Sequence, residues 1–239
     1  MKKGFSMRRV RLFTPVAAAA SAAALALSLA APAHAESTPE TAGETVSFGL
    51  FATGTERPEG SFDIERLEEF GVEGSDVELL AEGVVPETGS ETSAQQDDVL
   101  NRWDDVDGWE IIWREGRYDP VSGSGSGALK IDQKHNLSME AVRATTQYPY
   151  TSTSFPDDTK FQETAGGTSY RYQTEVWEVE CSGWLWWREC EIVDTRVVRA
   201  LVDFRIPSHS PEPVGAFNAY CEQNTGDRCP DWVREALNI

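Results

Sequence analysis

Five short groups of residues between Arg102 and Glu191 carry side chains that could act together on one charged substrate. An arginine guanidinium binds phosphate groups through its planar fork of donors. A carboxylate can stabilise positive charge that develops in a transition state, and a second one can orient or deprotonate an acceptor. In chain order, the groups are Arg102-x-Asp104, Glu110 to Gly116, His135, Ser152-Thr153-Ser154 and Glu189-x-Glu191.

The common catalytic signatures are absent from the sequence. It contains no Gly-x-Ser-x-Gly elbow, no phosphate-binding Gly-x4-Gly-Lys loop and no His-Glu-x-x-His zinc motif. Only His135 and His209 follow the leader, and no nucleophile beside either one indicates a Ser-His-Asp triad.

The order and spacing of the five groups resemble the mono-ADP-ribosyltransferase toxins of the cholera and pertussis type, over about residues 99–205. In that family the pattern runs from Arg-x-Asp, through a His and a Ser-Thr-Ser strand, to a Glu-x-Glu pair. His135 stands seventeen residues before Ser152, the gap that the resemblance asks for. The resemblance implies transfer of ADP-ribose from NAD, used as a substrate, to a target that is by family analogy a protein side chain.

The resemblance also assigns a role to each group. Glu191 would stabilise the charge that develops on the ribose, and Glu189 would orient or deprotonate the acceptor. Arg102 would clamp the diphosphate, and His135 would contact a ribose hydroxyl or a phosphate. A hydrogen bond to Glu191 and the shape of the strand end would come from the hydroxyl residues Ser152, Thr153 and Ser154.

Two other pairs compete with Glu189-x-Glu191 for the acidic role, namely Gln173-x-Glu175 and Glu178-x-Glu180. We favour Glu189 and Glu191 because they leave room for one complete strand after Ser154.

The elements that must position these side chains are mostly strands. Tyr170 to Glu180 alternates with a period of two, and Glu191 to Ile206 is rich in Val and Ile, so both predict strands. His135 to Thr145 predicts a short helix capped near Asn136 or Ser138. Together with the resemblance, these elements predict an α+β fold of two packed antiparallel β-sheets with short helices and disulfides.

Residues 1–35 have the pattern of a signal peptide. Basic residues through Arg11 precede an apolar stretch from Leu12 to about Leu29, and Ala33 and Ala35 satisfy the small-residue rule for cleavage. We therefore expect cleavage after Ala35 and a secreted protein. No later segment is apolar over the roughly 20 residues that a membrane span needs, so we expect no span in the mature chain.

The mature chain divides by composition at about residue 99. Residues 36–98 contain seventeen acidic residues against two arginines, which predicts a partly disordered acidic segment. Within it, Phe62 to Phe70 has partly helical spacing, and Val77 to Val85 could dock as a second short element. From residue 99 to 239 the content of aromatic and β-branched residues predicts a globular α+β domain.

Four cysteines allow three disulfide pairings, and an exported chain with an even count is expected to form them. We favour the two local pairs, Cys181 with Cys190 and Cys221 with Cys229. The spacings Cys-x8-Cys and Cys-x7-Cys are not those of zinc ligands, so no metal is expected.

The formal net charge is −19, and loss of the leader's basic residues brings it to about −24. Such a charge repels phosphate backbones, which argues against nucleic acid as a partner. Small molecules and basic proteins remain possible partners. The alternative function is a non-enzymatic secreted β-rich binding module, or a catalytically decayed relative of the toxins. In it Trp184, Trp186 and Trp187 would be either core residues or an exposed recognition patch.

Overall fold

The computed structural model describes residues 45–86, 99–150, 159–164, 166–222 and 228–239. The predicted leader with its cleavage site, and the predicted site residues Ser152, Thr153 and Ser154, lie outside the described residues.

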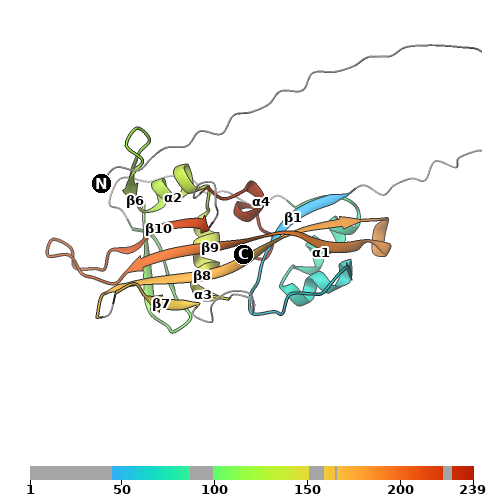
Figure 1. Cartoon of the computed structure of the whole chain (residues 1–239), viewed down its shortest axis with the longest axis horizontal. Helices are drawn as coiled ribbons and strands as arrows, with labels where there is room; N and C mark the ends of the chain where they lie inside the picture. The colour runs from blue at the N-terminus through green and yellow to red at the C-terminus, as the bar shows by residue number, and fades with distance from the viewer. Residues whose placement is uncertain (1–44, 87–98, 151–158, 165, 223–227) are drawn as a thin grey trace, which may run out of the picture. The chain divides into compact units, whose positions relative to one another are not determined.

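A long hairpin of two strands forms the centre of the fold (Figure 1). β8 (Ser169–Ser182) and β9 (Glu189–Asp203) pair antiparallel from Ser169 opposite Asp203 to Ser182 opposite Glu189. Both strands predicted from the sequence, the first by its alternation and the second by its Val and Ile content, are present with small shifts at their ends. The turn between them contains the 3-10 helix η2 (Leu185–Trp187).

Both local disulfides are present as predicted. Cys181–Cys190 closes the turn of the long hairpin, where the two cysteines stand directly opposite each other. Cys221–Cys229 links the end of strand β10 to the segment before the last helix. These disulfides fit an oxidising compartment.

The remaining strands extend the hairpin into one eight-stranded sheet with the order β1-β8-β9-β10-β4-β3, in which β2 also pairs with β9 and β7 with β8. Every pairing in it is antiparallel except that of β10 with β4. A separate two-stranded ribbon is formed by β5 and β6. The bounds of these strands are β1 Val46–Phe51, β2 Phe62–Asp63, β3 Val99–Asp104, β4 Glu110–Arg114, β5 Arg117–Asp119, β6 Ser124–Ser126, β7 Lys160–Gln162 and β10 Gly215–Glu222. The β-rich α+β class agrees with the prediction, but the described strands form one curled sheet and a ribbon instead of two packed sheets.

Two hydrophobic cores lie on opposite faces of the long hairpin. Tyr172 and Val176 of β8 are buried in the first core, whereas Trp177 and Val179 are buried in the second. Because successive strand residues point to opposite faces, the face of β8 that carries its apolar core residues changes after Val176. Beyond that point, one face of the hairpin is left for polar residues.

The first core is covered by α2 (Ala128–His135) and α3 (Met139–Gln147). The hydroxyl of Ser138 accepts a hydrogen bond of 3.1 Å from the N–H of Ala141, so Ser138 is the cap of α3, one of the two caps predicted. His135 does not begin this helix. It is the last residue of α2, a helix that the sequence reasoning did not predict.

The second core is built from the acidic region that we expected to lie outside the globular domain. β1, the 3-10 helix η1 (Ile64–Phe70) and α1 (Gly74–Ala81) pack against the hairpin, and Phe70 meets Trp177 edge-on at 5.9 Å. The boundary expected at residue 99 therefore does not separate residues 46–81 from the sheet. All of the apolar side chains in this range except Leu79 are buried.

Residues near the end of the chain fasten the first strand. After α4 (Asp231–Arg234), the side-chain amide of Asn238 donates to the carbonyls of Phe51 (2.8 Å) and Phe70 (2.7 Å) and accepts from the N–H of Phe51 (2.7 Å). Gly49 of β1 is required here, because a Cβ would lie 1.9 Å from the carbonyl oxygen of Trp232.

Candidate functional site

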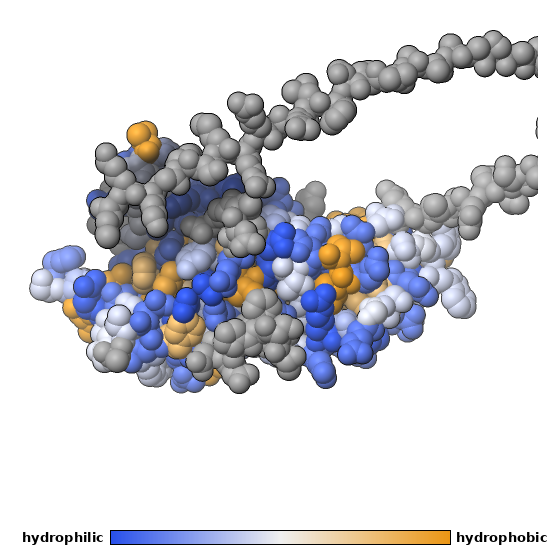
Figure 2. Space-filling model, viewed as in Figure 1, coloured by the Kyte–Doolittle hydropathy of each residue, from blue (hydrophilic) through white to orange (hydrophobic). Residues whose placement is uncertain are grey.

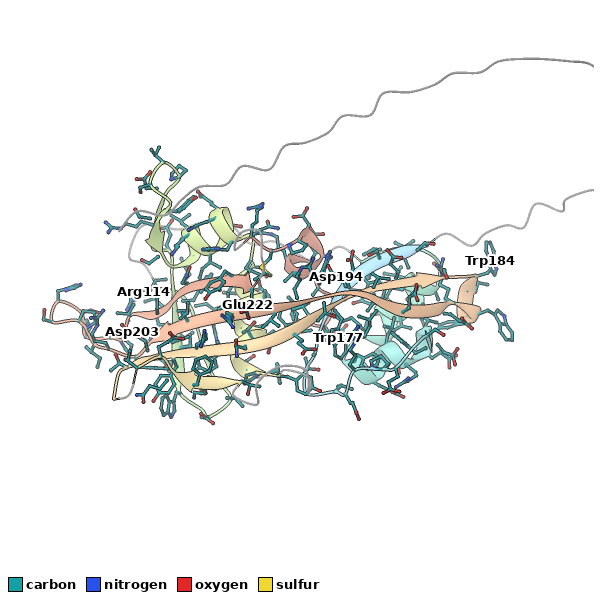
Figure 3. All side chains as sticks on the ribbon, viewed as in Figure 1. Arg114, Trp177, Trp184, Asp194, Asp203 and Glu222 are labelled. Carbon is teal, nitrogen blue, oxygen red and sulfur yellow. A yellow bond between two sulfur atoms is a disulfide. The ribbon has the colours of Figure 1, made fainter. Side chains whose placement is uncertain are left out.

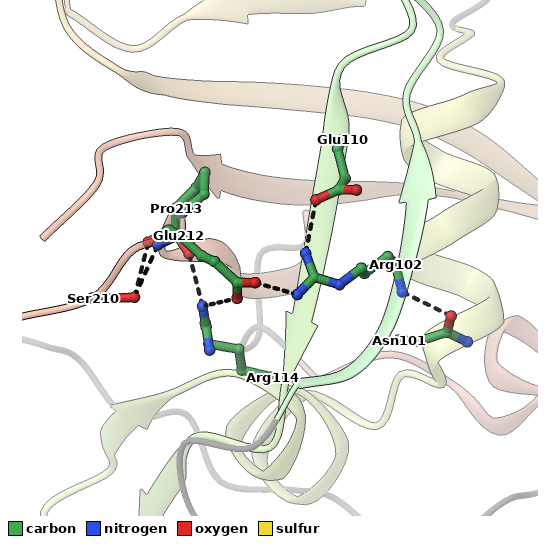
Figure 4. Close-up of polar contacts among 7 residues, drawn as sticks. All are labelled: Asn101, Arg102, Glu110, Arg114, Ser210, Glu212 and Pro213. Carbon is green, nitrogen blue, oxygen red and sulfur yellow. Dashed lines mark hydrogen bonds and ion pairs between the residues drawn. The ribbon is translucent and has the colours of Figure 1, made fainter.

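Arg102 lies on β3 and its guanidinium is held by carboxylates (Figure 4). Its Nη1 is 2.8 Å from Glu110 and its Nη2 is 2.5 Å from Glu212, while Glu212 also accepts from Arg114 at 3.2 Å. Hydrogen bonds to Glu212 and Glu110 raise the pKa of Arg102, and the bond from Arg102 lowers the pKa of Glu212. The Arg102 guanidinium, which was predicted to clamp a diphosphate, thus binds Glu212 and joins the 207–214 loop to the edge strand β3.

Glu189 and Glu191 lie at the start of β9 and are exposed. The strand register shows how far Arg102 lies from this pair. Asn101, the neighbour of Arg102, is paired with Trp113 of β4, and Trp113 is paired with Ala216 of β10. Ala216 is in turn paired with Val202 of β9, so Arg102 lies across the sheet from about Val202. From Glu191 to Val202 is eleven residues, or roughly 36 Å of strand at about 3.3 Å per residue. The structure therefore does not bring Arg102 together with the predicted acidic pair.

His135 is buried at the end of α2, with its ring centroid 5.9 Å from that of Tyr220 on β10. Its backbone carbonyl accepts a hydrogen bond of 2.8 Å from the N–H of Cys229. Asn136 follows in the left-handed region, with φ of 58°, and ends the helix. His135 therefore does not reach the predicted pair on β9, since Tyr220 is level with Arg199, eight residues beyond Glu191.

The competing pair Gln173 and Glu175 is buried on β8. Gln173 accepts a hydrogen bond of 2.7 Å from Arg199, and Glu175 accepts one of 3.2 Å from the indole N–H of Trp177. Tyr150, which precedes the Ser-Thr-Ser segment, bridges to Thr174, and its carbonyl accepts from the N–H of Glu175 at 2.9 Å. Burial, followed by the negative charge of Glu175, raises the pKa of Tyr150. Glu175 is thus the candidate carboxylate next to the point where the chain enters that segment.

The turn of the long hairpin has the longest run of consecutive exposed apolar residues among those that the structure describes, residues 184–187. We call residues 183–188 the tryptophan tip. In it Trp184, Trp186 and Trp187 are 63%, 50% and 86% exposed. Figure 3 shows Trp184 at one end of the hairpin and Asp203 toward the other. The sequence did not decide whether these tryptophans are core residues or surface residues, and the structure places them on the surface.

The tip is held in place from below. The guanidinium of Arg188 is buried and turned inward, donating to the carbonyls of Ala81 at 3.0 Å and Cys181 at 3.4 Å. Gly183 allows the chain to close, because a Cβ there would lie 2.8 Å from the carbonyl oxygen of Trp187. Leu185 has φ of 50°, a left-handed conformation that costs a non-glycine residue about 1–2 kcal/mol. Such strain persists where the surroundings fix the backbone.

Four carboxylates lie on one face of the hairpin directly behind the tip. We call Asp63, Glu180, Glu189 and Glu191 the acidic face. Glu180 is directly opposite Glu191 across β8 and β9, and Asp63 of β2 is directly opposite Glu189. Directly opposed residues, and residues two apart on a strand, point to the same side of a sheet. Among the described residues, no ion pair joins any of the four to a Lys or Arg.

The surface at the tip is pale to blue in a hydropathy view, since tryptophan scores near the middle of that scale (Figure 2).

A cavity of about 390 Å³ lies elsewhere, over β1 and α4, and it contains none of the predicted site residues. It is lined by Ser47, Phe48, Gly49, Val85, Pro86, Trp232 and Glu235.

Comparison with protein-family models, with curated proteins and with solved structures finds no match to this chain. Within the ranges that the structure describes, no group of three or more His, Cys, Asp and Glu residues could hold a metal ion. Within the same ranges, no helix is long and apolar enough to cross a membrane.

Proposed function

We propose that this protein is an extracellular binding module that engages its partner through the tryptophan tip. The exposure of three tryptophans on one disulfide-closed turn carries this proposal. Soluble proteins rarely leave large aromatic side chains together on the surface unless something covers them. Tryptophan is also among the residue types that contribute most to binding energy at interfaces.

The turn that carries the tryptophans is fixed by contacts within the chain, which favours a binding role for the tip. Each buried tryptophan contributes on the order of 150–250 Å² of contact, so three of them could form the centre of a small interface. The disulfide Cys181–Cys190 and the buried Arg188 hold the turn before any partner arrives. Little conformational entropy is then lost when the tip is covered, which increases affinity.

Photo-crosslinking tests the proposal in the organism that makes the protein. Trp187 is replaced by benzoylphenylalanine in the full chain, and Val121, which is 95% exposed between β5 and β6, is replaced in a matched control. We expect a discrete adduct from position 187, and none from position 121. The proposal fails if position 187 gives no adduct, or if both positions give the same adducts.

ADP-ribosyl transfer remains a second candidate, favoured by the bridge between Tyr150 and Thr174. That bridge brings the chain just before Ser152 to β8 beside Glu175. In this proposal Glu175 takes the role that the resemblance gave to Glu191. The bond between nicotinamide and ribose breaks, nicotinamide leaves, and the acceptor nucleophile, which loses its proton, bonds to the ribose.

Release of nicotinamide from NAD by the mature protein, with a mixed protein acceptor, tests this candidate. We expect Glu175→Gln to abolish release and Glu191→Gln to leave it unchanged. Absence of any release by the unaltered protein removes the enzymatic candidate and leaves the binding module.

A further inference from the structure

We propose that the partner of the tryptophan tip is a Lys- and Arg-rich segment of another protein, held jointly by the tip and the acidic face. This inference rests on the proposed binding function, and it adds the chemical class of the partner.

The acidic face contains two pairs of directly opposed carboxylates. Glu180 opposes Glu191 and Asp63 opposes Glu189, and like charges directly opposite each other on neighbouring strands destabilise a sheet. A cation placed between the members of each pair would turn repulsion into attraction. The nearest arginine in sequence, Arg188, does not do this because its guanidinium is buried and bonded to backbone carbonyls.

The other end of the same hairpin shows how this chain holds a cation. The ammonium of Lys160 lies 4.3 Å from the ring centroid of Trp109, 2.8 Å from Asp105, and in contact with Asp107. The rings of Tyr170 and Tyr172 also lie within 5.5 Å, so aromatic faces and two carboxylates together hold this ammonium group. The tip and the acidic face offer the same two kinds of group to solvent, and the cation must come from elsewhere.

Charge separates this partner from the other occupants of an aromatic surface. A second copy of the chain, with its own net charge of −19, is repelled, and so is a membrane surface rich in anionic lipid. A zwitterionic bilayer is not repelled, but it would leave the two opposed carboxylate pairs without a role. A basic polypeptide satisfies both the tip and the acidic face.

Binding of an octapeptide of alternating Lys and Arg to the full chain provides the test, measured by calorimetry at low and at high salt. The tip variant is Trp187→Ala, and the face variant is Glu180→Gln with Glu191→Gln. A charge-matched control is Asp104→Asn with Glu140→Gln, which removes two carboxylates far from the tip. Vesicles of phosphatidylcholine serve as the competing probe.

We expect the tip and face variants each to lower affinity at least about tenfold, and the control to change it less than about twofold. The face variant should also reduce the dependence of affinity on salt. The inference is overturned if the control weakens binding as much as the face variant does, because the peptide then senses only net charge.

Two further outcomes distinguish this inference from the proposed function. If the vesicles, or the adduct partner of position 187, bind through Trp187 and the face variant binds them equally well, the tip is a binding site but its partner is not basic. If neither the peptide, the vesicles nor an adduct depends on Trp187, both proposals fail.

Discussion

At the Asp203 end of the long hairpin, Trp109 lies edge-on against Tyr170 and Phe204, with both ring centroids at 5.2 Å. Lys160 covers its face, and the nearby Asp105 accepts hydrogen bonds from Lys160, Tyr172 and two backbone N–H groups. At the other end, Trp184 and Trp187 are exposed, and the carboxylates behind them have no ion pair among the described residues.

The two ends of the hairpin use the same residue types with opposite results. At the Asp203 end, Trp109 is 44% exposed, but its ring and the carboxylate of Asp105 have partners within the chain, and these contacts tie the 105–109 turn to β7 and β8. At the tip, the backbone is fixed by a disulfide and by Arg188, while the side chains point to solvent. The difference indicates that tryptophan content by itself does not identify a binding surface. The presence or absence of internal partners does.

Replacing Asp105 should have the largest effect on stability. Asp105→Asn leaves the ammonium of Lys160 largely buried with only Asp107 to pair with, and breaking a buried pair costs about 3–5 kcal/mol. Urea unfolding measures the loss. The neighbouring Asp104→Asn, on an exposed side chain, should stay within about 0.5 kcal/mol of the unaltered protein. Equal losses of stability at both positions would mean that the buried contacts of Asp105 contribute no more than an exposed carboxylate does.

The contribution of Asp105 should also depend on pH. Burial acts to raise its pKa, but hydrogen bonds from Lys160, Tyr172 and the backbone outweigh this effect and hold the pKa below that of a free aspartate. The stabilisation is therefore complete above the unfolded pKa and is lost as pH falls through the lower folded value. Unfolding free energies of the unaltered protein and Asp105→Asn should converge as the pH is lowered from about 6 to below the ordinary aspartate pKa of about 3.9. A constant difference over that range would contradict this.

The two disulfides should have similar effects on stability but different effects on the tip. Cys181–Cys190 and Cys221–Cys229 close segments of nearly equal length, with sequence separations of 9 and 8. Replacing either pair by serine should cost about 2–3 kcal/mol. Only loss of Cys181–Cys190 should speed hydrogen exchange within residues 183–188. Equal exchange in both variants would show that Arg188 suffices to hold the tip.

Removing one tryptophan from each end compares them directly. Trp109→Ala loses two edge-on ring contacts and the contact with Lys160, and should cost about 1–3 kcal/mol. Trp187→Ala should change the unfolding free energy by less than about 0.5 kcal/mol. A large loss for Trp187→Ala would mean that its ring has a structural role and would weaken the proposed binding function.

The smallest effect should come from Leu185→Gly. Glycine adopts φ of 50° without strain, which releases about 1–2 kcal/mol, but it also gains freedom in the unfolded chain. We expect a net stabilisation below about 1 kcal/mol in thermal unfolding. A net loss would show that the partly exposed Leu185 side chain contributes packing to the tip.

Several features of this fold could be predicted because their causes are local. The alternation from Tyr170 to Glu180 has the period of a strand. Cys181 and Cys190 flank a turn that brings them face to face, so their pairing follows from the hairpin. Ser138 caps α3 through a bond to a residue only three positions away.

The features that were missed depend on distant partners. β1 pairs with β8 about 130 residues later, and the local sequence of the acidic region does not indicate that pairing. Ser122 to Gly127 has the composition of a flexible loop, but it contains β6 and leads into α2. Gly116 is needed there, because its Cβ would lie 1.9 Å from the carbonyl oxygen of Ser126.

The expected convergence of Arg102 and Glu191 was not found for the same reason. Chain order does not determine strand order, and β10 and β4 lie between the strands that carry these residues. The exposure of Trp187 could not be predicted either, because a Trp-rich segment between two strands is equally compatible with a buried position. Only the placement of η1 and α1, which fill the second core without it, decides the question.

The fastening of β1 by Asn238 has a consequence for biosynthesis. Since a ribosome delivers the polypeptide from its amino end, Phe51 is made nearly 190 residues before the amide that holds it. β1 must also wait for β8, and Leu237, next to Asn238, completes the second core. A nascent chain of this protein would thus keep its second core open until residues 237 and 238 have been made.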